Sequence, residues 1–193
     1  MNPEFTSVTE PVNPGILLLP IARAAISSAL GQPLRVTEEA AWLQEAGACF
    51  VSLTQQAELR GCIGTLQAYR PLLADLKANA VAAAMHDTRF TALTLAELDH
   101  THIEVSLLSP MEALHFDTEA EALAQLRPGL DGVALEFERY RSTFLPQVWE
   151  QLPTAAAFIA QLKRKAGLAP NFWAQGLRLH RYTVRKWKEA EVS

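Results

Sequence analysis

Two expected hairpins constrain the fold of this chain more than any other feature. In each, two runs rich in β-branched, aromatic and aliphatic residues are separated by a short polar connection. Segments this close in the chain pair antiparallel, because a tight turn reverses the chain direction. The hairpin segments are residues 49–53 with 59–65, and 132–137 with 140–144. Two further strands are expected at residues 102–108 and 177–184.

Helical spacing of apolar residues fills much of the chain between these strands. Longer helices are expected after Asn13-Pro14, after Pro71 and after Thr154, and Pro20 predicts either a kink or a later start in the first one. Shorter helices are expected at residues 37–45, directly after Thr94 and at 119–126. Because helices and strands do not alternate strictly, we predict an α+β fold with mainly antiparallel sheets, rather than a doubly wound parallel sheet.

Composition places the chain among ordinary globular proteins of one domain. It has 193 residues and a formal net charge of −4, so it lacks the overall basic excess of nucleic-acid-binding proteins. Its apolar runs are much shorter than the roughly 20 residues that a bilayer span requires. Glu4 and Glu10 lie where a secretory signal would be basic, so we expect a cytoplasmic protein without a membrane segment. Its two cysteines are then expected as thiols.

The segment from Leu59 to Thr65 is the sharpest candidate for chemistry. Strand alternation predicts that Leu59 and Ile63 face the core, whereas Arg60 and Cys62 share the opposite face. A guanidinium beside a thiol favours the thiolate, which is the nucleophilic form. The glycines at 61 and 64 indicate close approach by a ligand or another backbone, or a bulge. The structural alternative is that Cys62 simply packs in the core, which is the interpretation we adopt for Cys49.

A catalytic base and a metal site are less well specified. Nothing in the spacing selects a base for Cys62 among the histidines at positions 86, 100, 102, 115 and 180. His100, His102 and Glu104 share one side of the expected strand, but its outer members lie about 13 Å apart at about 3.3 Å per residue. All three therefore cannot bind one ion, and the sequence contains none of the common zinc, P-loop or dinucleotide motifs. We predict no metal and no cofactor.

A basic strip near the C-terminus is the remaining candidate surface. Its cations are interleaved with His180, Tyr182 and Trp187, a pattern that suits contact with phosphate or RNA. The alternative is the solvated side of a terminal strand, which the acidic total charge favours. The strip consists of Arg178, Arg181, Arg185, Lys186 and Lys188.

Taken together, these motifs resemble the AMMECR domain, called system protein A in bacterial AmmeMemoRadiSam loci. The resemblance covers nearly the whole chain, from the first expected helix to Trp187. It implies one domain over residues 14–187, built as two entwined lobes with a groove between them, and tails at 1–13 and 188–193. The motifs that carry it are residues 59–64 (LRGCIG), 87–90 (DTRF), 104–108 (EVSLL), Gly129 with Gly132, 143–148 (TFLPQV) and 165–167 (KAG).

The resemblance also implies a set of site residues and partners. Cys62 and Arg60 belong to the family's hallmark segment, and Glu104 is the candidate that assists them. The candidate substrate-binding residues are Gly61, Gly64, Arg89, Phe144 and Pro146. Bacterial members of the family tend to accompany a Memo-like protein and a radical SAM enzyme, which implies a shared pathway and physical partners.

Two functions of different classes follow from these residues. The first is a thiol-dependent enzyme in which Cys62 acts on a small or peptide-like substrate. The alternative is a non-catalytic binding module, whose segment from Arg60 to Gly64 receives part of a partner protein or a product of the radical SAM enzyme. A third, more distant hypothesis is RNA binding through the basic strip.

Overall fold

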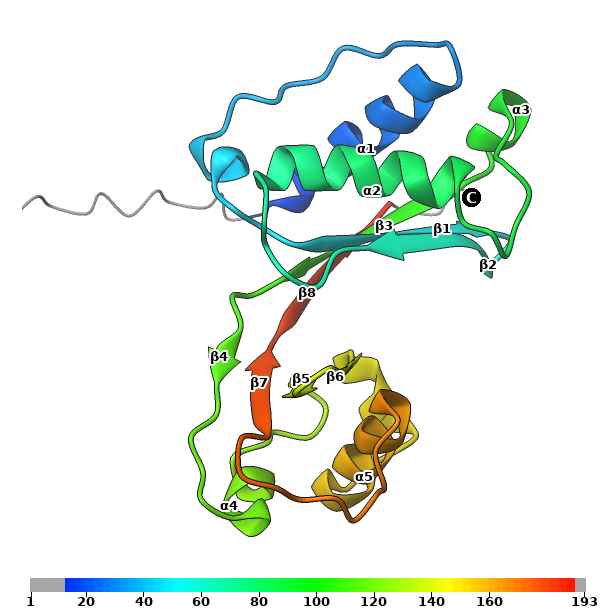
Figure 1. The fold of residues 1–193 in the computed structure, drawn as a ribbon. Helices are drawn as coiled ribbons and strands as arrows, with labels where there is room; N and C mark the ends of the chain where they lie inside the picture. Colours follow the sequence, from blue (N-terminus) through cyan, green and yellow to red (C-terminus); the bar gives the residue numbers. More distant parts are fainter. Residues whose placement is uncertain (1–12, 190–193) are drawn as a thin grey trace, which may run out of the picture. The chain divides into compact units, whose positions relative to one another are not determined.

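The computed structural model describes residues 13–189, in which helices pack on two antiparallel sheets (Figure 1). This confirms the α+β fold predicted from the sequence. The chain divides into two compact units, the first formed by residues up to Leu108 together with those from Arg185, and the second by Ser109–Val184. In the part of the chain that the structure describes, no helix is long and apolar enough to cross a membrane.

The first unit is a four-stranded sheet covered on one face by helices. Its strands lie in the order β2-β1-β3-β8, so that β2 and β8 form the edges. Figure 1 shows the two long helices, α1 and α2, on the same side of this sheet. Its elements are α1 (Gly15–Ala29), η1 (Ala41–Gln44), β1 (Cys49–Gln55), β2 (Glu58–Gly64), α2 (Leu72–Met85), α3 (Leu95–Leu98), β3 (His102–Leu108) and β8 (Val184–Lys188).

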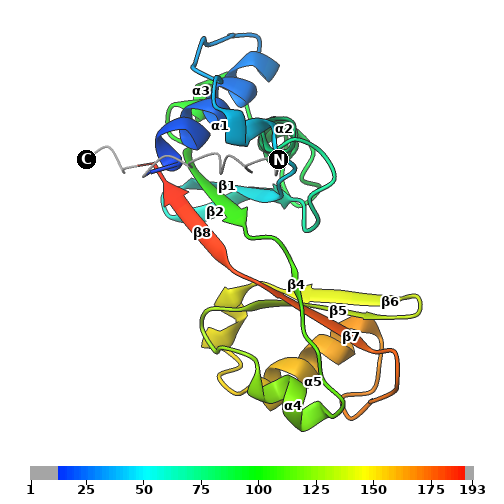
Figure 2. The same ribbon diagram turned by 90° about the vertical axis from the view of Figure 1, so that its left-hand side faces the viewer.

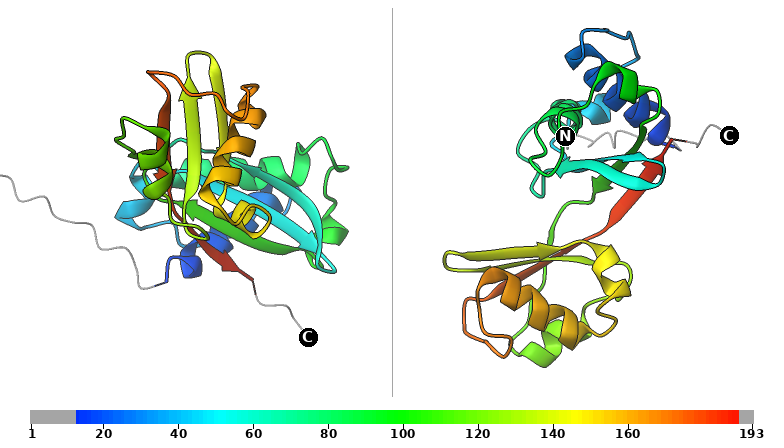
Figure 3. Two further views of the ribbon diagram at one scale, coloured as in Figure 1. Left: turned by 90° about the horizontal axis from the view of Figure 1, so that it is seen from below. Right: turned by 90° about the vertical axis from the view of Figure 1, so that its right-hand side faces the viewer.

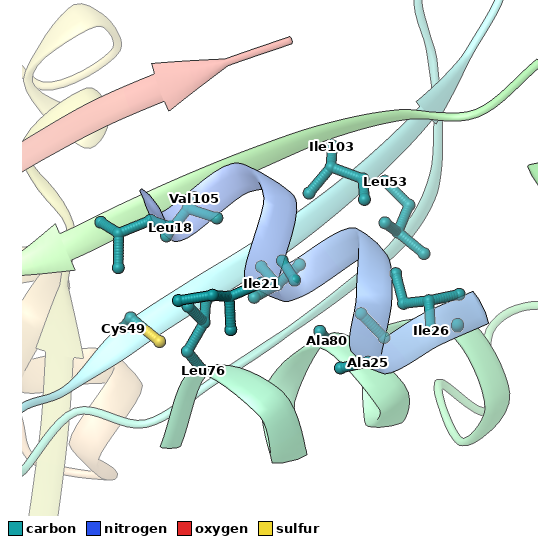
Figure 4. Packing of buried hydrophobic residues seen from close by; sticks show 14 of the residues in the cluster. Leu18, Ile21, Ala25, Ile26, Cys49, Leu53, Leu76, Ala80, Ile103 and Val105 are labelled. Carbon is teal, nitrogen blue, oxygen red and sulfur yellow. The ribbon is translucent and has the colours of Figure 1, made fainter. Parts of the chain in front are cut away.

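Alternating apolar residues of β1 and β3 form the floor of the first core. Val51, Leu53 and Val105 are fully buried beneath the helices. Figure 4 shows Leu18 of α1 and Leu76 of α2 packed over this floor. Burying a side chain of this size stabilises the fold by about 1.5–3 kcal/mol. The cluster therefore fixes which face of the sheet is turned away from the helices.

The first hairpin is tighter than its sequence predicts. The strands extend to Gln55 and begin again at Glu58, so that only Gln56 and Ala57 form the turn, with φ of 50° and 65°. Two consecutive residues with positive φ match the twist of the flanking strands. The register then shifts by one residue, because Thr54 pairs with Leu59 while Leu53 pairs with Gly61. Arg60 is the extra residue of this bulge.

The second unit is a smaller sheet with helices on one face. Its strands lie in the order β4-β7-β5-β6, and Figures 2 and 3 show α5 along one side of the β5–β6 hairpin. Its core is aromatic, since Trp149 stacks on Phe158 with ring centroids 4.0 Å apart. Its elements are β4 (Glu112–Ala113), α4 (Glu119–Ala124), β5 (Gly132–Phe137), β6 (Tyr140–Phe144), η2 (Pro146–Glu150), α5 (Ala155–Ala166) and β7 (Arg178–Tyr182).

Two sequence expectations are wrong, and so is one of the two alternatives for the first helix. The expected last strand, 177–184, is in fact β7 followed by β8, which belong to different sheets. The strands separate at Thr183, whose backbone N–H and C=O are both bonded to Ser109. The expected helix at 37–45 is only the short η1, and the first helix begins at Gly15 and runs through Pro20 instead of starting later.

Candidate functional site

A row of polar side chains crosses the sheet of the first unit on the face opposite its core. Ser52 of β1 lies directly across from Cys62 of β2 and, on its other side, from Glu104 of β3. Lys186 of β8 continues the row, with its Nζ 3.6 Å from Glu104 Oε1. Residues opposite each other in antiparallel strands point to the same face. We call Cys62, Ser52, Glu104 and Lys186 the polar row.

Cys62 is held by hydrogen bonds to its side chain and to both of its backbone groups. The Ser52 hydroxyl donates to Sγ of Cys62 at 3.2 Å. The backbone N–H of Cys62 donates to Asp87 Oδ2 at 2.9 Å, and its carbonyl oxygen accepts from Arg89 Nη2 at 3.2 Å. The thiol is half-buried. Sγ therefore has a fixed position and remains partly accessible.

Cys49 is the contrasting cysteine. It is fully buried in the first core, and Figure 4 shows its sulfur directed toward Leu76. Burial and then the negative charge of Asp75 raise the pKa of the Cys49 thiol far above its usual range. The expectation that Cys49 is a core residue is confirmed, and only Cys62 of the two remains a candidate nucleophile.

The loop that follows α2 supplies the charged partners of Cys62. Asp87 accepts from the backbone N–H, Nε and Nη2 of Arg89, at 3.2, 2.9 and 2.7 Å. The pKa of the Asp87 carboxyl is held well below its usual range, mainly by the hydrogen bonds from the Arg89 side chain and next by the one from the Cys62 N–H. Asp87 is also the main reason that the pKa of Arg89 is raised. Asp87 and Arg89 thus form an ion pair that is hydrogen-bonded to both backbone groups of Cys62.

Arg60 is not the cation beside Cys62 that strand alternation predicts. Its guanidinium donates to the carbonyl oxygen of Thr91 at 2.8 Å and forms an ion pair with Glu97 at 3.2 Å. The prediction of simple alternation along β2 fails because Arg60 sits in the bulge. For the same reason Leu59 is 45% exposed instead of facing the core. Arg89, rather than Arg60, is bonded to Cys62.

Arg60 instead lines a surface pocket of about 460 Å³ between the tip of the first hairpin and α3. Leu59, Glu97 and His100 also line this pocket. The pocket therefore combines an exposed apolar side chain with a paired guanidinium, and Cys62 is not among its lining residues.

The glycines of β2 permit two close approaches within the first unit. A Cβ atom at Gly61 would overlap the backbone carbonyl oxygen of Ala83 in α2. A Cβ atom at Gly64 would overlap the ring of Phe50 on β1. The sequence indicated that a ligand, another backbone or a bulge required these glycines, and at Gly61 the requirement comes from another backbone. This approach presses β2 onto α2 directly beside Cys62.

Glu104 belongs to the polar row but does not contact Cys62. The two residues lie on strands separated by β1, which at about 4.8 Å per strand places their backbones about 10 Å apart. Ser52 occupies the position between them. A proton that passes between Glu104 and the thiol must therefore travel through the Ser52 hydroxyl or through water.

The turn that carries Phe144 and Pro146 lies in the second unit. Phe144 ends β6 and packs edge-to-face on Phe158, with ring centroids 5.4 Å apart. The Lys165 ammonium lies 5.0 Å from the centre of the Phe144 ring. Pro146 begins η2. Both residues thus have structural partners within their own unit, and their role at a substrate site stays a prediction.

The histidines are scattered among different surroundings. His86 directly follows α2, His100 lines the pocket of Arg60, and His102 lies across from Thr54. In the described range 13–189, no histidine hydrogen-bonds to Cys62. The same range contains no group of three His, Cys, Asp or Glu side chains placed to hold a metal ion.

The basic strip is divided between two sheets, and Arg178, Arg181 and Lys186 are paired with acids. Arg178 and Arg181 lie on β7, where they form ion pairs with Glu136 at 3.0 Å and Glu112 at 2.7 Å. Lys186 lies on β8, in the polar row. These carboxylates offset the positive charge that an RNA backbone would require.

Ser52 and Asp87 were not among the residues expected at the site. Ser52 carries a signal that sequence reasoning can use, because it alternates with the buried Val51 and Leu53 and so must face away from the core. Asp87 could not be found in this way. Its contact with Cys62 joins a loop to a strand 25 positions away, and no local periodicity encodes that distance.

Comparison with known proteins agrees with this fold. The AMMECR1 family model matches residues 19–187. Protein MJ0810 of Methanocaldococcus jannaschii is 34% identical over 186 residues, which cover 92% of this chain and 90% of the relative. Protein PYRAB00100 of Pyrococcus abyssi is 33% identical over 192 residues, which cover 91% and 90%.

A solved structure agrees equally well. The crystal structure of the uncharacterized protein PH0010 from Pyrococcus horikoshii matches with a TM-score of 0.76 and 30% identity, over 91% of each chain. The chain therefore belongs to the AMMECR1 family.

Proposed function

We propose that this protein is a thiol-dependent enzyme whose nucleophile is Cys62. The observation that carries the proposal is the position of Sγ, which is half-buried on the sheet face opposite the core and accepts a hydrogen bond from Ser52 at 3.2 Å. Arg89, bonded to the carbonyl of the same residue, places a permanent positive charge nearby. A hydrogen-bond donor and a cation both favour the thiolate.

The chemistry that suits this arrangement is acyl transfer to a small or peptide-like substrate. Sγ attacks the carbonyl carbon, and a C–S bond forms as the bond to the leaving group breaks. The proton that the thiol gave up passes to the leaving group, with Glu104 as the candidate acid–base residue acting through the Ser52 hydroxyl or water. Water then cleaves the thioester and restores the thiol. In this proposal the enzyme shares a pathway with a Memo-like protein and a radical SAM enzyme, as the family resemblance implies.

An activated ester tests this proposal. Incubation with p-nitrophenyl acetate is expected to release a burst of p-nitrophenolate and to leave one acetyl group on Cys62, located by mass spectrometry. Cys62→Ser abolishes both signals, whereas Cys49→Ser, the matched control, retains them. A burst that survives Cys62→Ser, or no burst in the wild type, contradicts the proposal.

The pocket beside α3 favours a second candidate function, a binding module. Its lining by the exposed Leu59, beside the ion pair of Arg60 with Glu97, suits a segment of a partner protein that has an apolar side chain flanked by polar groups. The partner implied by the resemblance is a Memo-like protein. Arg60→Ala is then expected to weaken binding of a purified Memo-like protein in calorimetry, and Cys62→Ser to leave it unchanged. The reverse pattern excludes this candidate.

A further inference from the structure

The contacts of Asp87 and Arg89 carry an inference about substrate charge, which rests on the proposed role of Cys62. Asp87 accepts hydrogen bonds from the N–H of Cys62 and from three nitrogens of Arg89. Its side chain is only 4% exposed, whereas that of Arg89 is 55% exposed. The carboxylate therefore faces inward, and the guanidinium is the charge that a molecule approaching from solvent meets.

The hydrogen bonds that the Arg89 guanidinium donates do not use all of its nitrogens. Nε and Nη2 are directed to Asp87, and Nη2 also donates to the carbonyl oxygen of Cys62. Across residues 13–189, no hydrogen bond uses Nη1 of Arg89. An arginine whose orientation is fixed on one side and whose N–H groups are open on the other is suited to bind an anionic oxygen.

Asp87 offsets part of this charge on its buried side, but the acid of the polar row does not offset it further. Glu104 lies two strands from Cys62 and is paired with Lys186 at 3.6 Å. Arg60, the cation on β2 itself, is occupied by Glu97 and Thr91. Arg89 is thus the cation bonded to the residue that carries the nucleophile.

We propose that Arg89 is a specificity-determining residue, which selects electrophilic substrates that carry a carboxylate or phosphate group for reaction with Cys62. Asp87 is a positioning residue in this account. It acts through Arg89, because it fixes the guanidinium against the backbone of Cys62 and turns Nη1 outward.

Two alkylating reagents of nearly equal size test the proposal. Iodoacetate is anionic and iodoacetamide is neutral. With each, a bond forms between Sγ and the methylene carbon as the C–I bond breaks, and iodide leaves while the thiol proton goes to solvent. At Cys62, the rate of alkylation by iodoacetate is divided by the rate of alkylation by iodoacetamide. Dividing this value by the same ratio for N-acetylcysteine gives a normalised ratio, which isolates the effect of the protein charge.

Arg60→Gln is the matched control, because it removes an equal charge from β2, the strand that carries Cys62. The normalised ratio is expected to be equal in the wild type and Arg60→Gln, and to fall about fivefold in Arg89→Gln at low ionic strength. Arg89→Lys, which retains the charge, restores part of the ratio. Phosphate and acetate, added separately, are expected to slow alkylation of the wild type but not of Arg89→Gln, and the stronger competitor identifies the preferred anion.

The failures of the two proposals are distinguishable. If Cys62 reacts readily with both reagents and the ratio is the same in the wild type and Arg89→Gln, the inference on substrate charge is wrong and the nucleophilic role of Cys62 stands. If neither reagent modifies Cys62 in the native protein, both are wrong. Circular dichroism of each variant confirms that it is folded before rates are compared.

Discussion

Arg89 donates to the backbone carbonyl oxygen of Cys62 at 3.2 Å, across 27 positions of sequence. Cys62 lies on β2, an edge strand, whose outward N–H and C=O groups would otherwise be open to pairing with another chain. Asp87 accepts a hydrogen bond from the N–H of Cys62, and Arg89 donates one to its C=O. The side chains of Asp87 and Arg89 thus satisfy the outward backbone groups of Cys62 at the edge of the sheet and fix the position of the candidate nucleophile.

The ionised form of Asp87 is expected to contribute stability that disappears in acid. Its pKa is lowered in the folded protein, so this contribution is fully present above the unfolded value of about 3.9 and is lost as pH falls through the lower, folded value. Urea unfolding of the wild type and Asp87→Asn from pH 7 to pH 3 checks this. The stability difference should be constant above about pH 5 and should shrink below about pH 4. A difference that grows in acid contradicts the assigned cause.

Gly61→Ala is expected to destabilise the protein by about 2–3 kcal/mol, because its Cβ would overlap the backbone oxygen of Ala83 and force β2 away from α2. Urea denaturation measures the loss. Glu58→Ala, at an exposed position of the same strand, is the control and should change stability by less than about 0.5 kcal/mol. Equal effects of the two substitutions would show that the strand does not lie this close to α2.

The ion pair between Lys163 and Glu119 in the second unit predicts an asymmetric mutational effect. Lys163 is fully buried, 2.6 Å from a Glu119 carboxylate that is 40% exposed. Glu119→Gln leaves a buried ammonium without its counter-charge and should cost about 3 kcal/mol. Lys163→Met leaves only a hydrated carboxylate, and should change stability by less than about 1 kcal/mol. Thermal unfolding ranks the two, and a larger loss in Lys163→Met would contradict the account.

Asp75 is predicted to be the most sensitive acid of the first unit. Its fully buried carboxylate accepts from the Cys49 N–H, Thr65 and Arg70, and so joins the start of β1, the residue after β2 and the loop before α2. Asp75→Asn should cost about 3 kcal/mol in urea denaturation. Glu38→Gln removes a partly exposed partner of Lys77 and should cost less than about 1 kcal/mol. Similar losses in both variants would argue against the buried network.

Local patterns in the sequence predicted most elements but not the contacts of the site. The bounds of β3, β5 and β6 agree with those read from alternation, and α5 begins directly after Thr154, as its capping preference predicts. The pattern failed at Arg60, because a bulge changes which face a side chain takes without changing the composition of the strand.

Two other features that the sequence did not predict have a related cause. The separation of β7 from β8 is set by the bonds of Thr183 to Ser109, a partner 74 positions away. The contact of Asp87 with Cys62 likewise depends on how the loop after α2 folds back on the sheet. Tertiary contacts decide both features, and hydrophobic periodicity carries no information about them.

Alkylation of the native protein by iodoacetamide tests the central claim, that Cys62 is an activated thiol, most directly. Peptide mass spectrometry follows Cys62 and Cys49 separately through the reaction. We predict that Cys62 is modified rapidly while Cys49 is protected until the protein unfolds, and that Ser52→Ala slows modification of Cys62 without changing that of Cys49. If Cys62 is protected as completely as Cys49, or if Ser52→Ala leaves its rate unchanged, the thiol is not activated by the polar row and the account is contradicted.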